Sequence, residues 1–129
     1  TVQQAYIVAA KRTPIGKAPR GVFSSYRPDE LLAAAIRGML ADVPKLDPAA
    51  IEEVVAGCAL PGGPQGFNVA RISALLAGLP HTVAGMTVNR FCASGLSAIA
   101  IAADRIRTGQ ADIIVASGGE SMSQVPVWA

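Results

Sequence analysis

Two cysteines and one histidine are the side chains of this 129-residue sequence best suited to nucleophilic or acid–base chemistry. Cys92 follows a β-branched run that ends at Val88 and precedes a stretch rich in small residues. Cys58 lies inside another apolar run, and His81, the only histidine, stands next to Pro80. The structural element that carries each residue decides whether it can react.

Cys92 is the strongest candidate for a nucleophile because it lies where a strand passes into a helix. The apolar run ends at Val88, a short turn follows, and a helical pattern extends from about Cys92 to Gly109. Backbone amides at a helix start carry partial positive charge, which stabilises a thiolate and lowers the pKa of the thiol. Residues 93–95 are small, so a substrate can approach closely. Cys92 is therefore a candidate nucleophile.

A second interpretation of Cys92 is that it is an inert thiol of the core. The residues that follow it at steps of four, three, four and three are Leu96, Ile99, Ala103 and Ile106. They share one face of the predicted helix, and a cysteine at the end of an apolar stripe is most often buried. The sequence leaves both interpretations open.

Cys58 and His81 are weaker candidates. Cys58 ends an apolar run with no helix start behind it, so we interpret it as a packing residue of the core. His81 lies in a predicted loop, and a single imidazole without a second histidine or a pair of thiolates cannot form an ordinary zinc site. The sequence therefore predicts no metal site and no catalytic role for His81.

Other motifs that carry chemistry are incomplete. Gly16 and Lys17 lack the earlier glycine and the following Ser or Thr of a phosphate-binding loop. The glycines at 62–66 do not have dinucleotide-binding spacing, and Pro64 removes an amide donor. Ser123 stands where the nucleophile turn of a serine hydrolase needs its second glycine. These classes of enzyme are not supported.

The pattern of apolar residues predicts four strands that alternate with three helices. The predicted strands cover residues 5–9, 51–59, 83–88 and 113–116, and the predicted helices cover about 28–40, 68–78 and 92–109. Continuous β-branched runs suit parallel strands that are buried on both faces. The order β-α-β-α-β-α-β therefore predicts an α/β fold, a mostly parallel sheet with helices on both faces.

Composition excludes several partners. Hydrophobic residues make up 51% of the chain, charged residues 16%, and the net charge of +2 is not gathered into a block, so we expect no nucleic-acid partner. The apolar stretch at 98–103 is far too short to span a bilayer, and the first ten residues lack the pattern of a secretory signal. Two cysteines are too few for a disulfide framework, which favours a reducing compartment.

Three segments carry a family resemblance. The run Val88–Ile99, which contains Asn-Arg-Phe-Cys-Ala-Ser-Gly, resembles the acyl-enzyme signature of thiolases. Residues 12–17 and 118–123 also resemble thiolase segments in the expected order, so the resemblance covers essentially the whole chain. The Asn-Arg-Phe-Cys version is closer to the degradative 3-ketoacyl-CoA type than to the biosynthetic acetoacetyl-CoA type.

The resemblance implies a thiolase-like fold of two similar halves in five layers. Residues 1–120 would be an incomplete N-terminal half, and 121–129 would begin the segment that leads to a loop domain. Cys92 matches the cysteine that attacks a 3-ketoacyl-CoA, releases acetyl-CoA and passes its acyl group to free CoA. The backbone amide of Cys92 would be one donor to the thioester oxygen. Coenzyme A would be a substrate, and no permanently bound cofactor is implied.

The resemblance also implies that this chain is a fragment that cannot turn over alone. Thiolases carry a histidine in a Gly-His-Pro setting, a second cysteine and an asparagine-bearing loop beyond the matched region, whereas Leu79 and Pro80 precede His81 here. Implied partners are the remaining polypeptide, acyl-CoA and CoA, in a homodimer or homotetramer in the cytoplasm, or in the mitochondrial or peroxisomal matrix of a eukaryote. The alternatives are a silent thiolase-like scaffold or acyl-CoA- or lipid-binding protein, and another condensing enzyme of the superfamily.

Overall fold

A three-stranded parallel sheet forms the centre of the computed structural model, which describes residues 2–127. The strands are β1 (Glu53–Gly57), β2 (Ala84–Val88) and β3 (Ile114–Gly118), in the order β2-β1-β3. β1 is central, and its last residue, Gly57, lies opposite Val88 on one side and Gly118 on the other. The carboxyl ends of all three strands therefore meet at one edge of the molecule.

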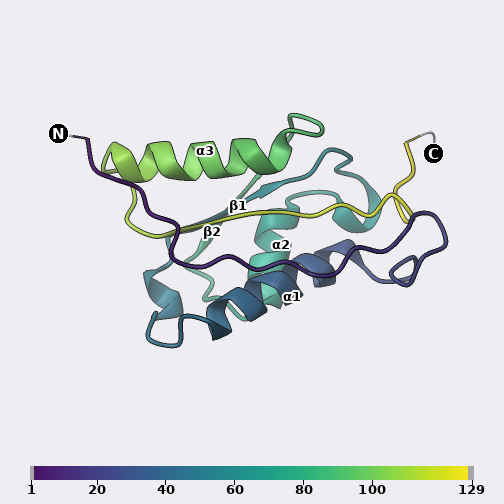
Figure 1. Ribbon diagram of the computed structural model, residues 1–129, viewed down its shortest axis with the longest axis horizontal. Helices are drawn as coiled ribbons and strands as arrows, with labels where there is room; N and C mark the ends of the chain where they lie inside the picture. The colour runs from purple at the N-terminus through teal and green to yellow at the C-terminus, as the bar shows by residue number, and fades with distance from the viewer. Residues whose placement is uncertain (1, 128–129) are drawn as a thin grey trace.

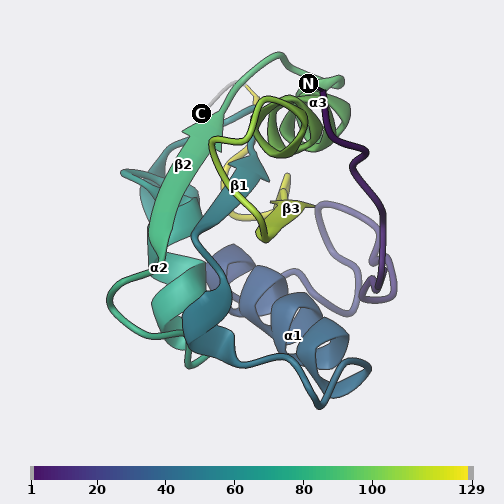
Figure 2. The same cartoon turned by 90° about the vertical axis from the view of Figure 1, so that its left-hand side faces the viewer.

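Helices cover both faces of this sheet. α1 (Pro28–Ala41) and α2 (Val69–Leu76) pack on one face, and α3 (Ser94–Arg107) packs on the other (Figures 1 and 2). Two short 3-10 helices, η1 (Pro48–Ala50) and η2 (Gly63–Gln65), lie in the connections. The predicted α/β fold class, a parallel sheet between helical layers, is confirmed.

Local sequence signals account for the ends of the helices. α1 begins with Pro28 and has two acidic residues in its first turn, which suits the positive end of the helix dipole. The side chain of Asn68 caps α2 by accepting a hydrogen bond from the Arg71 N–H at 3.3 Å. α3 ends at Arg107, two residues before Gly109, whose φ of +75° is a conformation that glycine adopts without strain.

The predicted strand at residues 5–9 is absent from the sheet. The side chains of Tyr6, Ile7 and Val8 are 78%, 79% and 81% exposed, although their types suit a buried strand. The segment passes β3 across a cavity of about 820 Å³. A parallel strand is stable only when its backbone pairs with a neighbour, and residues 5–9 pair with the outer edge of neither β2 nor β3. The prediction of a strand here is therefore wrong.

The end of the described chain packs beside residues near its beginning. Gln124 Nε2 donates to the Tyr26 carbonyl at 2.9 Å, and the Ser121 N–H donates to Gln65 Oε1 at 2.8 Å. Of the predicted final segment 121–129, residues 128 and 129 lie outside the described part, as does residue 1 of the segment 1–120.

No helix within residues 2–127 has the length and apolar character needed to cross a bilayer.

The two faces of the sheet are packed differently. The larger core lies between the sheet and helices α1 and α2, where Leu32, Ile36 and Val54 are buried. α3 instead presents Ser94, Ala98 and Ala102, which recur every four residues and are all buried. Small side chains on this helix face let its backbone lie close to the strands beneath it.

Glycine is required where α3 meets β1. A Cβ at Gly57 would lie 2.5 Å from the Ser94 carbonyl carbon and 2.6 Å from the Gly95 N, closer than real Cβ atoms come. A Cβ at Gly95, by contrast, would meet no atom within 4 Å. The close contact therefore depends on the strand glycine and not on the helix glycine.

We expect Gly57→Ala to lower the free energy of unfolding by about 3 kcal/mol, since backbone atoms cannot move aside as a flexible side chain would. Gly95→Ala is the matched control and should change it by less than about 1 kcal/mol, because its methyl group enters open space within a helix. Urea unfolding of the two variants tests the difference. Equal stabilities would contradict the role given to Gly57.

Candidate functional site

Cys92 lies in the turn between β2 and α3 and is exposed. α3 begins at Ser94, so the thiol stands two residues before the helix and not at its first residue. The apolar stripe predicted to continue from Cys92 is not buried in the described chain, since Leu96 is 70% and Ile99 45% exposed. The prediction that Cys92 is buried in the core is therefore wrong for the described chain.

Hydrogen bonds from inside the protein fix the shape of this turn. Phe91 has a φ of +49°, a left-handed conformation that is strained by about 1–3 kcal/mol for a bulky residue. Ser94 Oγ, which is buried, accepts from the Arg90 N–H at 2.8 Å and donates to the Phe91 carbonyl at 2.6 Å. The buried hydroxyl of Ser94 thus joins the backbone of Arg90 to that of Phe91 on the inner side of the turn, while Cys92 is exposed on the outer side.

Asn89 ties the same turn to the loop that follows β1. Its Oδ1 accepts from the Phe91 N–H at 2.9 Å, and its Nδ2 donates to the Ala59 carbonyl at 3.1 Å. The oxygen of the Asn89 side chain is therefore bonded within the turn, and its nitrogen is bonded to the loop that follows β1. The turn that carries Cys92 is therefore hydrogen-bonded to the loop after β1 as well as to the start of α3.

The backbone N–H of Cys92 itself is the candidate donor at this site. No side chain caps the start of α3, and the Ala93 and Ser94 N–H groups donate to the Arg90 and Phe91 carbonyls at 3.1 and 3.0 Å. Within residues 2–127 the Cys92 N–H donates no hydrogen bond. The first N–H groups of a helix have no partner within the helix, and they carry partial positive charge. Such donors can stabilise a thiolate, or the oxyanion that forms when a thiolate attacks a carbonyl.

Cys58 has the opposite environment. It is fully buried, as predicted, and its Sγ donates to Glu120 Oε2 at 3.5 Å. Burial, together with the nearby negative charge of Glu120, raises the pKa of the Cys58 thiol to about 11. Burial and the raised pKa both disfavour the thiolate form of Cys58 at neutral pH.

Glu120 is a site residue that the sequence did not single out. Its Oε1 accepts from the Ala59 N–H at 2.7 Å, and its Oε2 accepts from the Leu60 N–H at 3.1 Å and from Gln65 Nε2 at 2.5 Å. The available signal was its position two residues after a parallel strand, at the edge of a sheet where polar groups converge. Glu120 joins the loop after β3 to the loop after β1.

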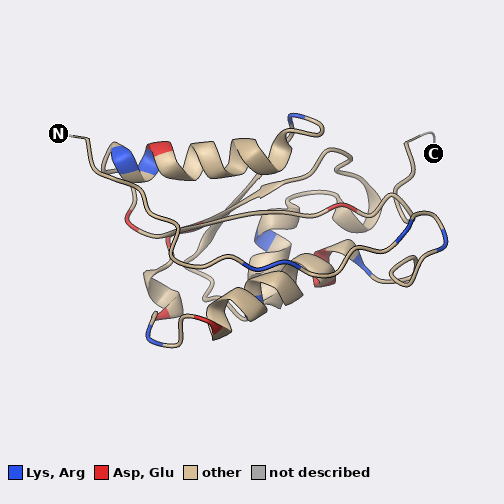
Figure 3. Ribbon diagram, viewed as in Figure 1, with Lys and Arg blue, Asp and Glu red and all other residues tan. Residues whose placement is uncertain are grey.

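His81 is not brought near Cys92. It is exposed and lies before the first residue of β2, whereas Cys92 follows the last residue of that strand. Within residues 2–127, moreover, no three His, Cys, Asp or Glu side chains are grouped so that they could hold a metal ion. Basic and acidic residues are spread over several elements (Figure 3).

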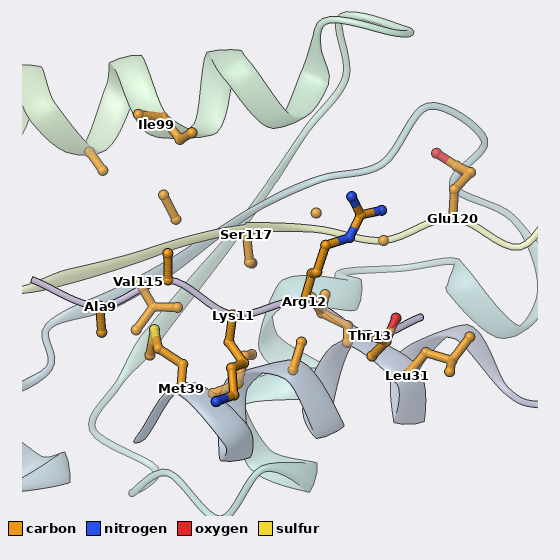
Figure 4. Close-up of a pocket in the computed structure, with 18 of the residues that line it drawn as sticks. Ala9, Lys11, Arg12, Thr13, Leu31, Met39, Ile99, Val115, Ser117 and Glu120 are labelled. Carbon is orange, nitrogen blue, oxygen red and sulfur yellow. The ribbon is translucent and has the colours of Figure 1, made fainter. Parts of the chain in front are cut away.

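The cavity of about 820 Å³ lies apart from Cys92. It is bounded by residues 5–18, α1, β3 and the inner side of α3, and Cys92 is not among the residues that line it. Arg12, Thr13 and Glu120 are lining residues near one end (Figure 4). Two of the three thiolase-like segments, 12–17 and 118–123, therefore face one cavity, while the third carries the exposed cysteine.

These features define an α/β unit with a candidate site for covalent chemistry at the carboxyl end of its sheet. The family model described as the N-terminal domain of thiolase matches residues 5–129. The chain belongs to the thiolase family, and the resemblance stated from the sequence is confirmed.

Individual relatives agree with this assignment. The chain is 45% identical over 126 residues to a 3-ketoacyl-CoA thiolase of Bacillus subtilis (strain 168), covering 98% of the chain and 32% of the relative. It is 46% identical over 125 residues to the 3-oxoadipyl-CoA/3-oxo-5,6-dehydrosuberyl-CoA thiolase of Escherichia coli (strain K12), covering 97% and 31%. The chain thus spans about one third of the length of the curated relatives it matches.

Iodoacetamide should label the two thiols at very different rates. We expect rapid labelling of Cys92 at about pH 8, because the thiol is exposed. A pKa of about 11 leaves roughly one thiolate in a thousand at Cys58, and burial blocks access as well. Peptide mass spectrometry checks the site, with Cys92→Ser as the control that abolishes labelling of the folded chain. Early labelling of Cys58 would contradict the structure.

The stability of the chain should fall at alkaline pH because of Cys58. The folded-state pKa is raised to about 11, so the unfolded chain releases this proton first, and stability present below about pH 9 is lost as the pH rises toward 11. In a Cys92→Ser background with reductant, Cys58→Ser should remove this part of the pH dependence. Urea unfolding across pH 8 to 11 measures both chains. Parallel curves would show that Cys58 makes no such contribution.

Proposed function

We propose that this chain is the nucleophile-bearing part of a thiolase-type acyltransferase, in which Cys92 carries the acyl group as a thioester. The observation that supports this most strongly is the exposed Cys92 thiol beside the uncapped start of α3, within the run that resembles the thiolase acyl-enzyme signature. The names of the relatives indicate 3-ketoacyl-CoA thioesters as the class of substrate.

The proposed reaction has two steps. The Cys92 thiolate attacks the 3-keto carbon, the bond between C2 and C3 breaks, and C2 takes a proton to leave as acetyl-CoA. The thiolate of a free CoA then attacks the Cys92 thioester, the shortened acyl-CoA departs, and Cys92 leaves as a thiolate. The reverse sequence is a Claisen condensation. The Cys92 N–H is available to stabilise the oxyanion in each step.

The proton transfers need groups that the described chain does not place beside Cys92. His81 lies at the other end of β2, and the thiol of Cys58 is buried with a raised pKa. We therefore propose that the base and the second thiol come from the polypeptide that corresponds to the remaining two thirds of the relatives. Alone, the chain is expected to be inactive.

The proposal extends to ligands and assembly. CoA and acyl-CoA bind as substrates, without a permanently bound cofactor. A free Cys92 thiol requires a reducing compartment, such as a bacterial cytoplasm. A homodimer or homotetramer is supported by β2, which is an edge strand paired only with β1 within the described chain.

A second candidate is a catalytically silent thiolase-like protein that binds acyl-CoA or lipid. The observation that favours it is the cavity of about 820 Å³, which the lining residues of α1, β3 and α3 make largely apolar and which lies apart from Cys92. The two candidates differ in one measurable property, the formation of a covalent thioester on Cys92.

A chimera tests the proposal. The chain replaces the matching segment of the Bacillus subtilis 3-ketoacyl-CoA thiolase, and the product is incubated with acetyl-CoA. We expect an acetyl group on the peptide that contains Cys92. Cys92→Ser should lower turnover by about 10³-fold or more, since it removes the nucleophile. Cys58→Ser, the matched thiol control, should keep acetylation.

The outcomes separate the two candidates. Acetylation of Cys58, or of neither cysteine, would count against covalent catalysis at Cys92. Retained binding of acyl-CoA without any acetylated cysteine would support the silent binding protein.

A further inference from the structure

Three loops meet at the carboxyl end of the sheet, and two side chains connect them. Glu120, after β3, accepts from the Ala59 N–H at 2.7 Å, while Asn89, after β2, donates to the Ala59 carbonyl at 3.1 Å. Ala59 follows β1, the central strand, so its loop is held from both neighbouring strands. Two hydrogen bonds, one to the N–H and one to the carbonyl of Ala59, therefore connect the Glu120 carboxylate with the Asn89 side chain.

The path continues into the turn that carries the thiol. Asn89 Oδ1 accepts from the Phe91 N–H at 2.9 Å, and Phe91 is the residue whose φ of +49° precedes Cys92. A left-handed conformation at a phenylalanine persists only when its surroundings enforce it. Asn89 supplies part of that restraint, and the orientation of Asn89 depends in turn on Ala59.

The carboxylate of Glu120 is suited to hold several donors at once. It accepts from two backbone N–H groups, the Gln65 amide and the Cys58 thiol, and within residues 2–127 it forms no ion pair with a Lys or Arg. A neutral glutamine could not replace it, because the NH₂ group of glutamine would face donors. The proposed two-step reaction leaves this carboxylate without a role.

We propose that Glu120 and Asn89 are positioning residues for Cys92, acting in series through the backbone of Ala59; this inference rests on the proposed thiolase function. Glu120 fixes the loop after β1, the Ala59 carbonyl fixes Asn89, and Asn89 holds the Phe91 turn. Without either side chain, the turn relaxes and the thiol loses its alignment with the substrate carbonyl. Within residues 2–127 neither side chain forms a hydrogen bond with Cys92, so both act through other residues.

A double-mutant cycle in the chimera tests this series arrangement. Glu120→Gln removes the charged acceptor, and Asn89→Ser keeps a short acceptor for the turn but cannot reach Ala59. Each variant should lower kcat and the rate of Cys92 acetylation about tenfold, with KM changed by less than about twofold, since misplacement by about 1 Å is costly. The double variant should be no slower than the slower single variant.

Two controls separate positioning from stability and from charge. Glu53→Gln is the same substitution at a carboxylate that pairs with Arg105 of α3 at the opposite end of β1, and it should leave kcat within about twofold. Iodoacetamide labelling of Cys92 without substrate gives a second readout. Loss of the Glu120 charge alone would favour the thiolate and speed labelling, so slower labelling is the sign of lost positioning.

The outcomes distinguish this inference from the proposed function. If the parent chimera fails to acetylate Cys92, the proposed function fails, and the labelling rates alone decide whether the two residues act in series. Multiplicative effects in the double variant, faster labelling of Glu120→Gln, or an equal loss in Glu53→Gln would each overturn the inference. If Glu120→Gln does not fold, the test rests on Asn89→Ser, because Asn89 is exposed and its substitution should not prevent folding. Unchanged kcat and an unchanged rate of Cys92 labelling in Asn89→Ser would then overturn the proposal. The expected decrease in both would support it.

Discussion

The close approach of α3 to the central strand is the constraint on which the candidate site depends. At Gly57 the helix backbone comes so near that no side chain fits between them. This contact buries Ser94, and the buried Ser94 hydroxyl closes the turn around Phe91. Cys92, the next residue, is left on the surface just before the start of the helix. One missing Cβ on a strand thus determines where the thiol can lie.

Secondary structure was predictable wherever its causes are local. The three helices and the strands β1, β2 and β3 follow the expected order, because periodicity, capping residues and terminal glycines act within a few residues. The apolar run at 5–9 has the composition of a strand, yet it does not join the sheet. Strand pairing is a contact between distant segments, and composition does not state which edge is free to accept another strand.

The site was predictable only in part, for the same reason. Cys92 was found because a strand, a turn and a helix start are consecutive in the sequence. The stripe that begins with Leu96 was expected in the core, but the helix buries the face of Ser94, Ala98 and Ala102. Only small side chains fit at such a distance from the strands, which the helical period alone does not reveal. Glu120 was missed because its partners, at Cys58 to Gln65, are 55 to 62 residues away.

The two cysteines show how the same fold produces opposite chemistry from one side chain. Both follow the carboxyl end of a strand, and hydrogen bonds link their loops. The Cys58 thiol is enclosed and faces a carboxylate, so its charged form is disfavoured and its pKa is raised to about 11. Cys92 lies beyond the Asn89 contact, where its thiol is exposed to solvent and its own N–H donates no hydrogen bond within residues 2–127. Because Glu120 accepts four donors on the Cys58 side, it also anchors the loop against which the Cys92 turn is built. The Glu120 carboxylate can therefore raise the pKa of the Cys58 thiol through its charge and help to position the Cys92 thiol through its hydrogen bonds.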